Sequence, residues 1–360
     1  MKIGIGRLLP RWSVLAFAAG LLSAAPAFAE DKIGFIYVGP AADYGYNMSM
    51  DLGRRYVEKN MPGVSTTAFE AIPETAEVER VMERLISSGH KIIFATSYGY
   101  LDYAIKVGER HPEVTILHAG GLKTSKNVGT YWADSDAGMY LAGIIAAHAS
   151  KSGKFGFQGG FQIPQLMRSV NAFTLGAQSV NPKATTTVVW NGGWWEPQKE
   201  SEATNAFADL GIDVIAEQVD SPITIAQAAE KRGIFMIGKD VDIHDRAPKA
   251  WLTGVSWNWG PMMVEEIRKV KAGTWKPAHV RGDLASGNVV LDPFGASVPE
   301  SVKAMVLKVK EDIIAGRKSI WEGPIAKADG SIVVPAGRKL GMEQIETMDY
   351  LVKGVVGATK

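Results

Sequence analysis

Cysteine is absent from the 360-residue chain. The sequence therefore excludes a disulfide framework, a thiolate metal site and a lipid anchor on cysteine. Histidine is scarce as well, and the six histidines never recur at the spacing of metal ligands. Three of them, His90, His111 and His148, fall near predicted helix ends, where a solvent-facing or capping role is commoner. We therefore predict neither a metal site nor a cofactor.

An excess of charge of one sign is also missing. Setting Lys2, Arg7 and Arg11 aside from the 39 basic residues leaves 36 against 38 acidic ones, a formal charge of −2. This balance excludes nucleic acid as a partner and provides no polybasic surface for anionic lipid. After residue 30, glycine, proline or charge interrupts every apolar run too early for it to span a bilayer. We expect no direct insertion into a membrane.

The first 29 residues differ in character from the rest. Lys2, Arg7 and Arg11 precede an apolar run at 14–22, and Ala27-Phe28-Ala29 follows. This order is typical of a secretory signal peptide that is cut after Ala29. The alternative, a membrane anchor, is disfavoured because the apolar run is shorter than the roughly 20 residues that span a bilayer. The sequence predicts a mature protein that works outside the cytoplasm.

Strands and helices alternate along the first half of the mature chain. The predicted strands are 32–38, 64–69, 91–96 and 114–118, and the predicted helices are 47–59, 74–88 and 101–111. In the first helix Met48, Leu52 and Tyr56 share one face, which we expect to point inward, and in the second Val78, Val81 and Leu85 do so. Strict alternation predicts a parallel sheet covered on both faces.

A second run of the same kind begins at Lys154-Phe155-Gly156-Phe157, which is similar to Lys32-Ile33-Gly34-Phe35. Its predicted elements are helix 166–180, strand 185–190, helix 200–210, strand 214–216, helix 223–232 and strand 235–238. The fold class is therefore α/β, with two doubly wound parallel-sheet lobes at 30–150 and 151–279. We expect the helix at 136–150 to join the lobes, and part of 280–360 to cross back and complete the first lobe across a hinge.

Aromatic residues gather after the predicted strands. Ligands of open parallel sheets bind beyond the carboxyl ends of strands, so two facing lobes place the site in the cleft between them. The candidate ring contacts are Tyr46, Tyr98, Trp194, Trp195 and Trp257, and the candidate polar contacts are Asn47, Ser97, Asp134 and Asp240. We expect Tyr46 and Trp195 to sandwich a planar heterocycle from opposite lobes. Each tryptophan has packing within a core as its alternative role, and Asp240 has helix capping.

Signals for catalysis are weak by comparison. The sequence has no Gly-x-Ser-x-Gly elbow, no phosphate loop and no complete Gly-x-Gly-x-x-Gly motif opening a helix. We predict a binding protein without catalytic residues. The alternative of another class is an extracytoplasmic nucleoside hydrolase that uses Asp134, Asp240 and His244.

Three motifs resemble those of the basic membrane protein family, the purine-nucleoside receptor group of type I periplasmic binding proteins. They are Asp43-x-Gly45-Tyr46-Asn47, Tyr140-Leu141-Ala142-Gly143 and Gly238-x-Asp240-x-Asp242. The family's first loop usually reads Asp-x-Ser-Phe-Asn, so Gly45 stands where relatives have serine. The resemblance implies the binding component of an ABC importer, with a purine as ligand and an inner-membrane permease as partner.

Two departures from the family refine this expectation. Trp257 stands where many relatives keep a lysine that contacts the ligand. We therefore expect a smaller, less polar guest, a free purine base at least as readily as a nucleoside. The missing lipid-bearing cysteine suggests a soluble periplasmic protein, which we expect to be a monomer. A sugar or autoinducer-type receptor of the same fold stays open as an alternative, because sugars also stack on tryptophan.

Overall fold

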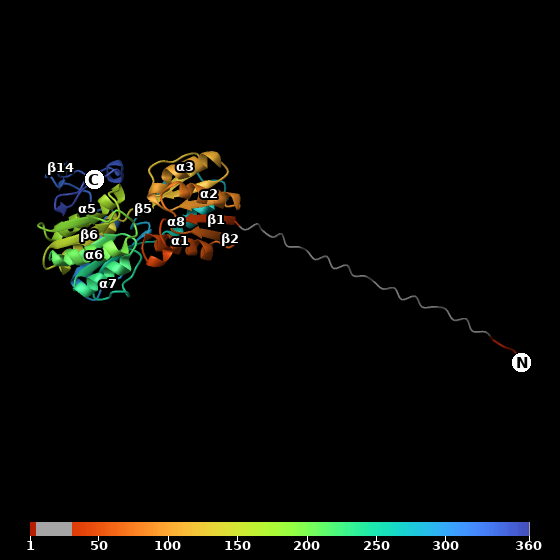
Figure 1. Ribbon diagram of the computed structural model, residues 1–360, viewed down its shortest axis with the longest axis horizontal. Helices are drawn as coiled ribbons and strands as arrows, with labels where there is room; N and C mark the ends of the chain where they lie inside the picture. Colours follow the sequence, from red (N-terminus) through yellow and green to blue (C-terminus); the bar gives the residue numbers. More distant parts are fainter. Residues whose placement is uncertain (5–30, 360) are drawn as a thin grey trace.

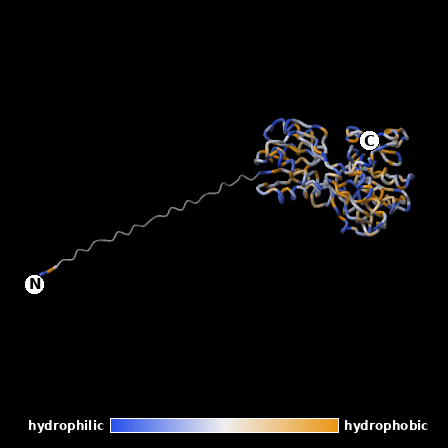
Figure 2. The backbone as a smooth tube through the Cα atoms, turned by 180° about the vertical axis from the view of Figure 1, so that it is seen from behind, coloured by the Kyte–Doolittle hydropathy of each residue, from blue (hydrophilic) through white to orange (hydrophobic). Residues whose placement is uncertain are grey.

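The computed structural model describes residues 1–4 and 31–359, and forms two α/β lobes that lie side by side (Figure 1). The predicted signal peptide, including its cleavage after Ala29, lies outside the described residues apart from the first four. Within the described ranges, no helix combines the length and the apolar character that crossing a bilayer would require. Hydrophobic stretches run through the interior of both lobes (Figure 2). The structure has the predicted fold class.

The first lobe is built on a six-stranded sheet. Its strand order is β2 (Val64–Phe69), β1 (Asp31–Ile36), β3 (Ile92–Ala95), β4 (Thr115–Ala119), β5 (Val128–Ala133) and β11 (His279–Gly282), and neighbouring strands are parallel. Helices α2 (Ala76–Ser87) and α3 (Leu101–Arg110) pack together, as do α1 (Tyr46–Asn60) and α8 (Gly260–Lys271). Successive side chains of β1 point to opposite faces of the sheet: Phe35 packs in one hydrophobic cluster and Ile36 in another. The sheet therefore has a hydrophobic core on each face.

The predicted inward face is correct for α2 and wrong for α1. Val78, Val81 and Leu85 of α2 are all buried. In α1, however, Leu52 and Tyr56 are exposed. The buried face of α1 is partly polar, with Met50 and Val57 beside Asp51, and its polar side chains have hydrogen-bond partners: the Tyr37 hydroxyl donates to Asp51 Oδ1 at 3.2 Å. A helix whose buried face is partly polar has no apolar periodicity that reveals it.

The second lobe is built on a seven-stranded sheet. Its strand order is β12 (Val289–Leu291), β10 (Trp251–Trp257), β9 (Phe235–Asp240), β8 (Val214–Gln218), β6 (Lys154–Gly159), β7 (Thr185–Trp190) and β15 (Val355–Val356), with β12 antiparallel to β10. Its helices are α4 (Asp136–Ala149), α5 (Pro164–Val180), α6 (Pro197–Asp209), α7 (Pro222–Arg232) and α9 (Glu300–Ile314). The C-terminal segment adds the hairpin β13 (Ile325–Ala326) and β14 (Ile332–Val334) and the short helix α10 (Met342–Glu346).

The chain passes between the lobes after β5, after β10 and between β11 and β12. Helix α4, predicted to join the lobes, packs along α5 and so belongs with the second sheet. Helix α8 follows β10 of the second sheet and packs on α1 of the first lobe. The sequence predicts that part of 280–360 completes the first lobe. Strand β11 does join the first sheet, whereas β12 and β15 pair in the second sheet. Three crossings in one region make a hinge.

Close backbone approach explains why α4 packs on the second lobe. A Cβ added to Gly143 of α4 would collide with the carbonyl oxygen of Phe173, and one added to Gly176 of α5 would collide with that of Tyr140. The two helices therefore touch backbone to backbone at these glycines. The helix that the sequence predicts as the connection between the lobes is therefore packed closely against α5.

We predict that Gly143→Ala destabilises the protein by about 1–3 kcal/mol, because the added methyl group forces the two helices apart. Denaturant unfolding monitored by tryptophan fluorescence measures this loss. Gly341→Ala is the matched control, since an added Cβ there meets its nearest heavy atom at 3.7 Å; it should stay within about 0.5 kcal/mol of wild type. Equal stability of the two variants would contradict the proposed close contact.

Candidate functional site

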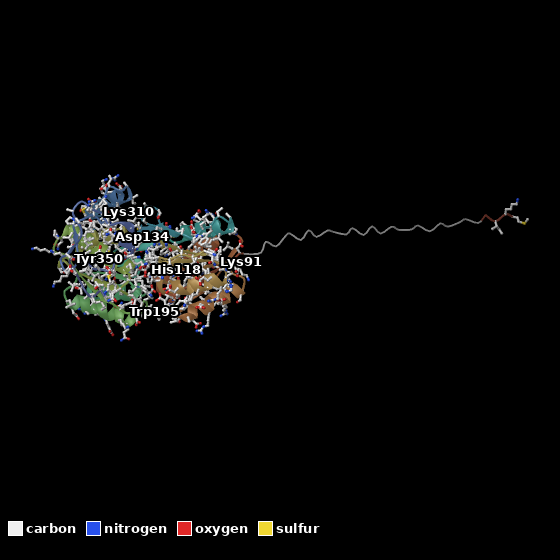
Figure 3. All side chains as sticks on the ribbon, turned by 90° about the horizontal axis from the view of Figure 1, so that it is seen from above. Lys91, His118, Asp134, Trp195, Lys310 and Tyr350 are labelled. Carbon is white, nitrogen blue, oxygen red and sulfur yellow. The ribbon has the colours of Figure 1, made fainter. Side chains whose placement is uncertain are left out.

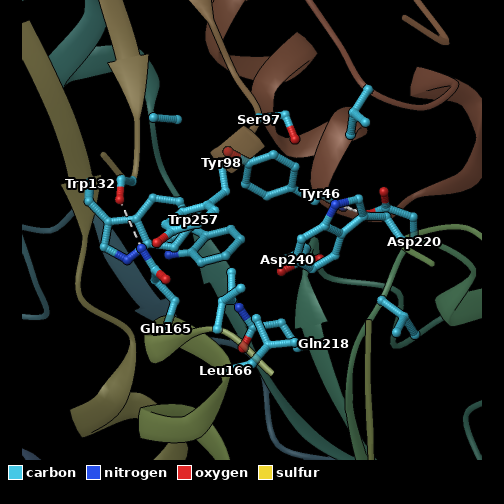
Figure 4. A pocket seen from close by; sticks show the side chains of 16 residues that line it. Tyr46, Ser97, Tyr98, Trp132, Gln165, Leu166, Gln218, Asp220, Asp240 and Trp257 are labelled. Carbon is cyan, nitrogen blue, oxygen red and sulfur yellow. Dashed lines mark hydrogen bonds between the residues drawn. The ribbon is translucent and has the colours of Figure 1, made fainter. Parts of the chain in front are cut away.

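A cavity of about 490 Å³ lies between the lobes, at the carboxyl ends of both sheets (Figure 4). The first lobe contributes residues that lie at or after the ends of β1, β3 and β4 or belong to α1 and β5: Val38, Tyr46, Ser97, Tyr98, Ala119, Gly120 and Trp132. The second lobe contributes residues at or after the ends of β6 to β10: Ile163, Gln165, Leu166, Trp194, Gln218, Val219, Asp220, Asp240 and Trp257. We call this cavity the cleft pocket.

Aromatic rings form one continuous wall of the cleft pocket. The ring centroids of Trp132 and Trp257 lie 5.2 Å apart, and Tyr46 meets Trp257 edge-on at 5.5 Å. Trp259 supports the wall from behind, 5.1 Å from Trp257 and 5.6 Å from Trp132. Such edge-on and tilted pairs add about 0.5–1.5 kcal/mol each beyond the burial of area. The wall is therefore rigid before any ligand arrives.

Hydrogen bonds hold three of the rings, those of Trp257, Trp259 and Tyr46, in place. The Trp257 Nε1–H donates to the Ala133 carbonyl at 3.0 Å, and the Trp259 Nε1–H donates to Ser49 Oγ at 3.0 Å. The Tyr46 hydroxyl donates to the Thr96 carbonyl at 2.6 Å. Burial raises the pKa of Tyr46 well above its usual value, so this hydroxyl keeps its proton and stays a donor.

A buried ion pair supports Trp257 from below. Lys239 Nζ lies 3.1 Å from the Trp257 ring centroid and 3.1 Å from Asp240 Oδ1, and the Lys239 side chain is fully buried. Burial lowers the pKa of Lys239, which Asp240 partly offsets, and burial raises that of Asp240. The two groups satisfy each other beneath the ring. The positive charge acts on the aromatic face through a cation–π contact.

Asp220 connects the two lobes at the start of α1. Its carboxylate follows β8 in the second lobe and accepts the Tyr46 backbone N–H at 2.9 Å and the Asn47 Nδ2–H at 2.8 Å. Helix α1 has no side-chain cap from its own N-cap residue, Gly45. Asp220 thus caps a helix of the opposite lobe, where unpaired N–H groups and the helix dipole favour a carboxylate.

Glycine is required at position 45 by this contact. A Cβ there would lie 2.6 Å from Asp220 Cα and 2.9 Å from Asp220 Oδ1. A serine would cap α1 from within its own lobe and would hold the second lobe away. Burial, followed by repulsion from Asp240, raises the pKa of Asp220 well above its usual value, whereas the two N–H donors favour the charged form.

Three side chains that line the cleft pocket have buried polar atoms without a hydrogen-bond partner in the described part of the chain. They are Gln165 Oε1, Gln218 Oε1 and Trp194 Nε1, two acceptors and one donor. A buried polar atom left unpaired costs about 1–3 kcal/mol, so these atoms are ready to bind a guest.

The family model described as "ABC transporter substrate-binding protein PnrA-like" matches residues 30–327. The chain belongs to this family. Among its relatives, a purine-binding protein of Brucella abortus is 38% identical over 345 residues, which cover 95% of this chain and 98% of that protein. A putative ABC transporter glucose-binding protein of Haloferax volcanii is 31% identical over 289 residues, 80% of this chain and 73% of that protein.

A solved structure supports the fold. The chain is similar to an ABC transporter solute-binding protein from Aeropyrum pernix K1, with a TM-score of 0.71 and 18% identity, over 88% of this chain and 95% of that one. This likeness shows the two-lobed fold alone. As a PnrA-like protein, the chain is a substrate-binding component of an ABC transporter and not an enzyme. The hydrolase alternative is thereby set aside.

The structure brings most of the predicted ligand contacts of this PnrA-like protein together. Six of the nine line the cleft pocket: Tyr46, Ser97, Tyr98, Trp194, Asp240 and Trp257. The predicted sandwich of Tyr46 and Trp195 is absent, because Trp195 is 47% exposed and borders a more open cavity with Pro73 and Phe161. Trp195 lies at the edge of the molecule in the view of Figure 3. Its neighbour Trp194 turns inward instead and packs edge-on against Phe161 at 5.0 Å.

Two further predicted contacts are engaged within the protein. Asn47 donates to Asp220, and Asp134 accepts a hydrogen bond from Arg168 Nη2 at 2.9 Å. Neither lines the cleft pocket. Sequence reasoning missed Gln165, Gln218 and Asp220 as pocket residues. Gln218 ends β8 and Asp220 follows it, so the rule about strand ends could have identified both.

We predict that Asp220→Ala opens the ligand-free protein, because Tyr46 N–H and Asn47 lose their acceptor in the other lobe. Small-angle X-ray scattering should show a larger radius of gyration than for wild type. Asp209→Ala is the control, since Asp209 is exposed on α6 and pairs with Arg232 within the second lobe. Superimposable scattering curves for Asp220→Ala and wild type would contradict the role of this contact.

Glu200, fully buried in the first turn of α6, predicts a pH dependence of stability. Burial raises its pKa from 4.5 to about 7. Its stabilising protonated form is fully populated below 4.5 and is lost as the pH rises through about 7. Glu200→Gln should therefore raise the free energy of unfolding at pH 8 by on the order of 3 kcal/mol and change it little below pH 5.

Thermal unfolding at pH 5 and pH 8 measures this difference. The Glu200→Gln variant should melt several degrees above wild type at pH 8 only. Exposed Glu202, two residues along α6, provides the control Glu202→Gln, which should follow wild type at both pH values. The same shift at both pH values would show that protonation of Glu200 is not the cause.

Proposed function

We propose that this protein is the periplasmic binding component of an ABC importer and closes its two lobes around a purine, with the free base preferred. The observation that carries this proposal is the pairing of a rigid aromatic wall with three unpaired polar atoms on the facing side chains. A purine has two flat apolar faces and an edge that carries both N–H donors and ring-nitrogen acceptors. Gln165 Oε1 and Gln218 Oε1 can accept from such an edge, and Trp194 Nε1 can donate to it.

Charge favours a neutral guest. Asp220 is bound by Tyr46 and Asn47, and Asp240 is paired with Lys239. Both carboxylates that line the cleft pocket thus have partners already. A phosphate would meet these buried carboxylates without an unpaired cation among the lining residues, which disfavours nucleotides.

The position of Trp257 favours the base over the nucleoside. Its ring lies over Lys239 Nζ, 3.1 Å from the ring centroid to the nitrogen, and Lys239 does not line the cleft pocket, so this cation is not offered to a ribose. The name of the Brucella abortus relative, 38% identical, supports a purine as the class of ligand.

A sugar is the second candidate, because the Haloferax volcanii relative is named as glucose-binding and sugars stack on tryptophan. A hexose carries hydroxyl groups around the whole edge of its ring, and each of them needs a hydrogen-bond partner in a closed cleft. The wall of Tyr46, Trp132 and Trp257 offers few such partners. The aromatic lining therefore favours the purine.

Closure of the two lobes is the step that connects ligand binding to transport. The closed form joins residues of both lobes, which a permease in the inner membrane would recognise as one surface. The predicted signal peptide at 1–29 supports a location in the periplasm. We thus propose import as the direction of transport, an inner-membrane permease as the partner and the periplasm as the location.

We predict that calorimetry detects binding of adenine, hypoxanthine or guanine and no binding of glucose. Tyr98→Ala should weaken purine binding about tenfold, since it removes one ring of the lining at a side chain that is 37% exposed and has little structural role. Tyr103→Ala, on α3 outside the cleft pocket, is the matched control and should bind like wild type. Tight glucose binding with silent purines would overturn the assignment of the ligand.

A further inference from the structure

A contact between Tyr44 and Arg246 joins the two lobes outside the cleft pocket. Arg246 lies in the loop between β9 and β10 of the second lobe, and its Nη2–H donates to the Tyr44 hydroxyl of the first lobe at 2.9 Å. Its guanidinium carbon also lies 4.9 Å from the centroid of the Tyr44 ring. The arginine of one lobe therefore holds the tyrosine of the other by a hydrogen bond and by a cation–π contact.

The Tyr44 side chain packs against the core of the opposite lobe. It is half-buried and lies against a hydrophobic cluster whose buried members all belong to 207–251 of the second lobe. Two of these members, Ile243 and Ala247, come from the loop that carries Arg246. The contact between the lobes thus buries apolar area in addition to forming the hydrogen bond.

The backbone of Tyr44 has an unfavourable conformation. Its φ of +63° and ψ of 14° lie in the left-handed region, which is uncommon for a bulky side chain. Such a conformation persists where surrounding contacts fix it. The next residue is Gly45, which leaves the room that Asp220 needs for its approach from the second lobe. The second lobe therefore contacts the chain at Tyr44 and directly after it, and separation of the lobes would free Tyr44 to relax.

Neither residue of the Tyr44–Arg246 pair reaches the ligand cavity. They line neither the cleft pocket nor the cavity beside Trp195. The Arg246 side chain is 44% exposed, and its Nε lies 3.5 Å from the carboxylate of the neighbouring Asp245. The pair can thus change the free energy of lobe closure without changing a contact to the ligand. Asp220 differs in this respect, because it lines the cleft pocket.

We propose that the Tyr44–Arg246 pair is a latch that stabilises the closed form both with and without a ligand. A contact that exists only between closed lobes must break before the lobes separate, so it slows opening. A ligand enclosed in the cleft leaves after opening, and the latch therefore lowers the release rate of every ligand by the same factor. This inference goes beyond the proposed function and does not depend on the identity of the ligand.

Distance measurements between two spin labels test the latch in the ligand-free protein. Because the chain has no cysteine, Ser87→Cys on α2 and Glu202→Cys on α6 provide one exposed label site on each lobe. Double electron–electron resonance then separates closed from open molecules. Arg246→Ala should lower the ratio of closed to open molecules about tenfold, through loss of the hydrogen bond and the cation–π contact. Tyr44→Ala should lower it at least as much, because it also loses the packing, and Tyr44→Phe should lower it less.

Lys106→Ala is the matched control. It removes the cation–π contact of Lys106 with Tyr103, 5.6 Å from the nitrogen to the ring centroid, which lies wholly within α3 of the first lobe. Its ratio of closed to open molecules should equal that of wild type. The double variant Tyr44→Ala/Arg246→Ala should open no further than Tyr44→Ala alone, since both changes remove the same contact. Additive effects would show that the two residues act separately and would overturn the latch.

Stopped-flow fluorescence with adenine and hypoxanthine tests the consequence for release. Arg246→Ala should speed the release of both compounds by one common factor of about ten. Unchanged rates, or factors that differ between the two compounds, would contradict a latch that acts independently of the ligand.

The failures of the two proposals are distinguishable. Equal ratios of closed to open molecules in wild type, Tyr44→Ala and Arg246→Ala would overturn the latch, whatever the purines do. If wild type bound neither adenine nor hypoxanthine, the proposed ligand would fall, and the distance measurements on the ligand-free protein would still decide the latch.

Discussion

The contact between Asp220 and the start of α1 is the interaction on which the closed arrangement depends. One carboxylate from the second lobe accepts two hydrogen bonds from the first, at the helix end where unpaired N–H groups need an acceptor. Gly45 leaves the space that this approach requires. Closure of the lobes therefore also caps helix α1. The hydrogen bonds that stabilise the start of α1 thus contribute to the free energy of lobe closure. The aromatic wall is itself shared between the lobes, with Tyr46 and Trp132 from the first and Trp257 from the second.

The site achieves neutrality by pairing its charges within the protein. Lys239 and Asp240 pair beneath Trp257, and Asp220 is held by N–H donors. What the cleft offers a guest is a set of flat apolar faces and a few unpaired amide and indole atoms. Recognition in such a site depends on shape and on the pattern of donors and acceptors, because charge has already been satisfied.

Much of the fold and part of the site could be predicted from the sequence. The alternation of strands and helices, the two lobes and the buried face of α2 follow from local patterns that tertiary contacts do not override. Residues at the carboxyl ends of strands or in the segments that follow them, such as Tyr46, Ser97 and Trp257, also fall where the topology of parallel sheets places them. Trp195 and Asp134 do not line the pocket. The direction of a side chain in a turn, and the presence of a partner such as Arg168, depend on packing between distant segments.

The sequence by itself determined the class of the protein: a two-lobed α/β chain with aromatic strand ends and no cysteine, whose motifs resemble one binding-protein family. Hydrophobic periodicity and residue order carry that information because they act over short stretches of chain. Only the tertiary structure decided which lobe holds α4, which tryptophan faces the cleft, and that Asp220 caps α1 from across the hinge. Those outcomes depend on contacts between residues of different elements, some of them far apart in the sequence, such as Tyr46 and Asp220, whose sequence separation is 174. Local patterns do not encode such contacts.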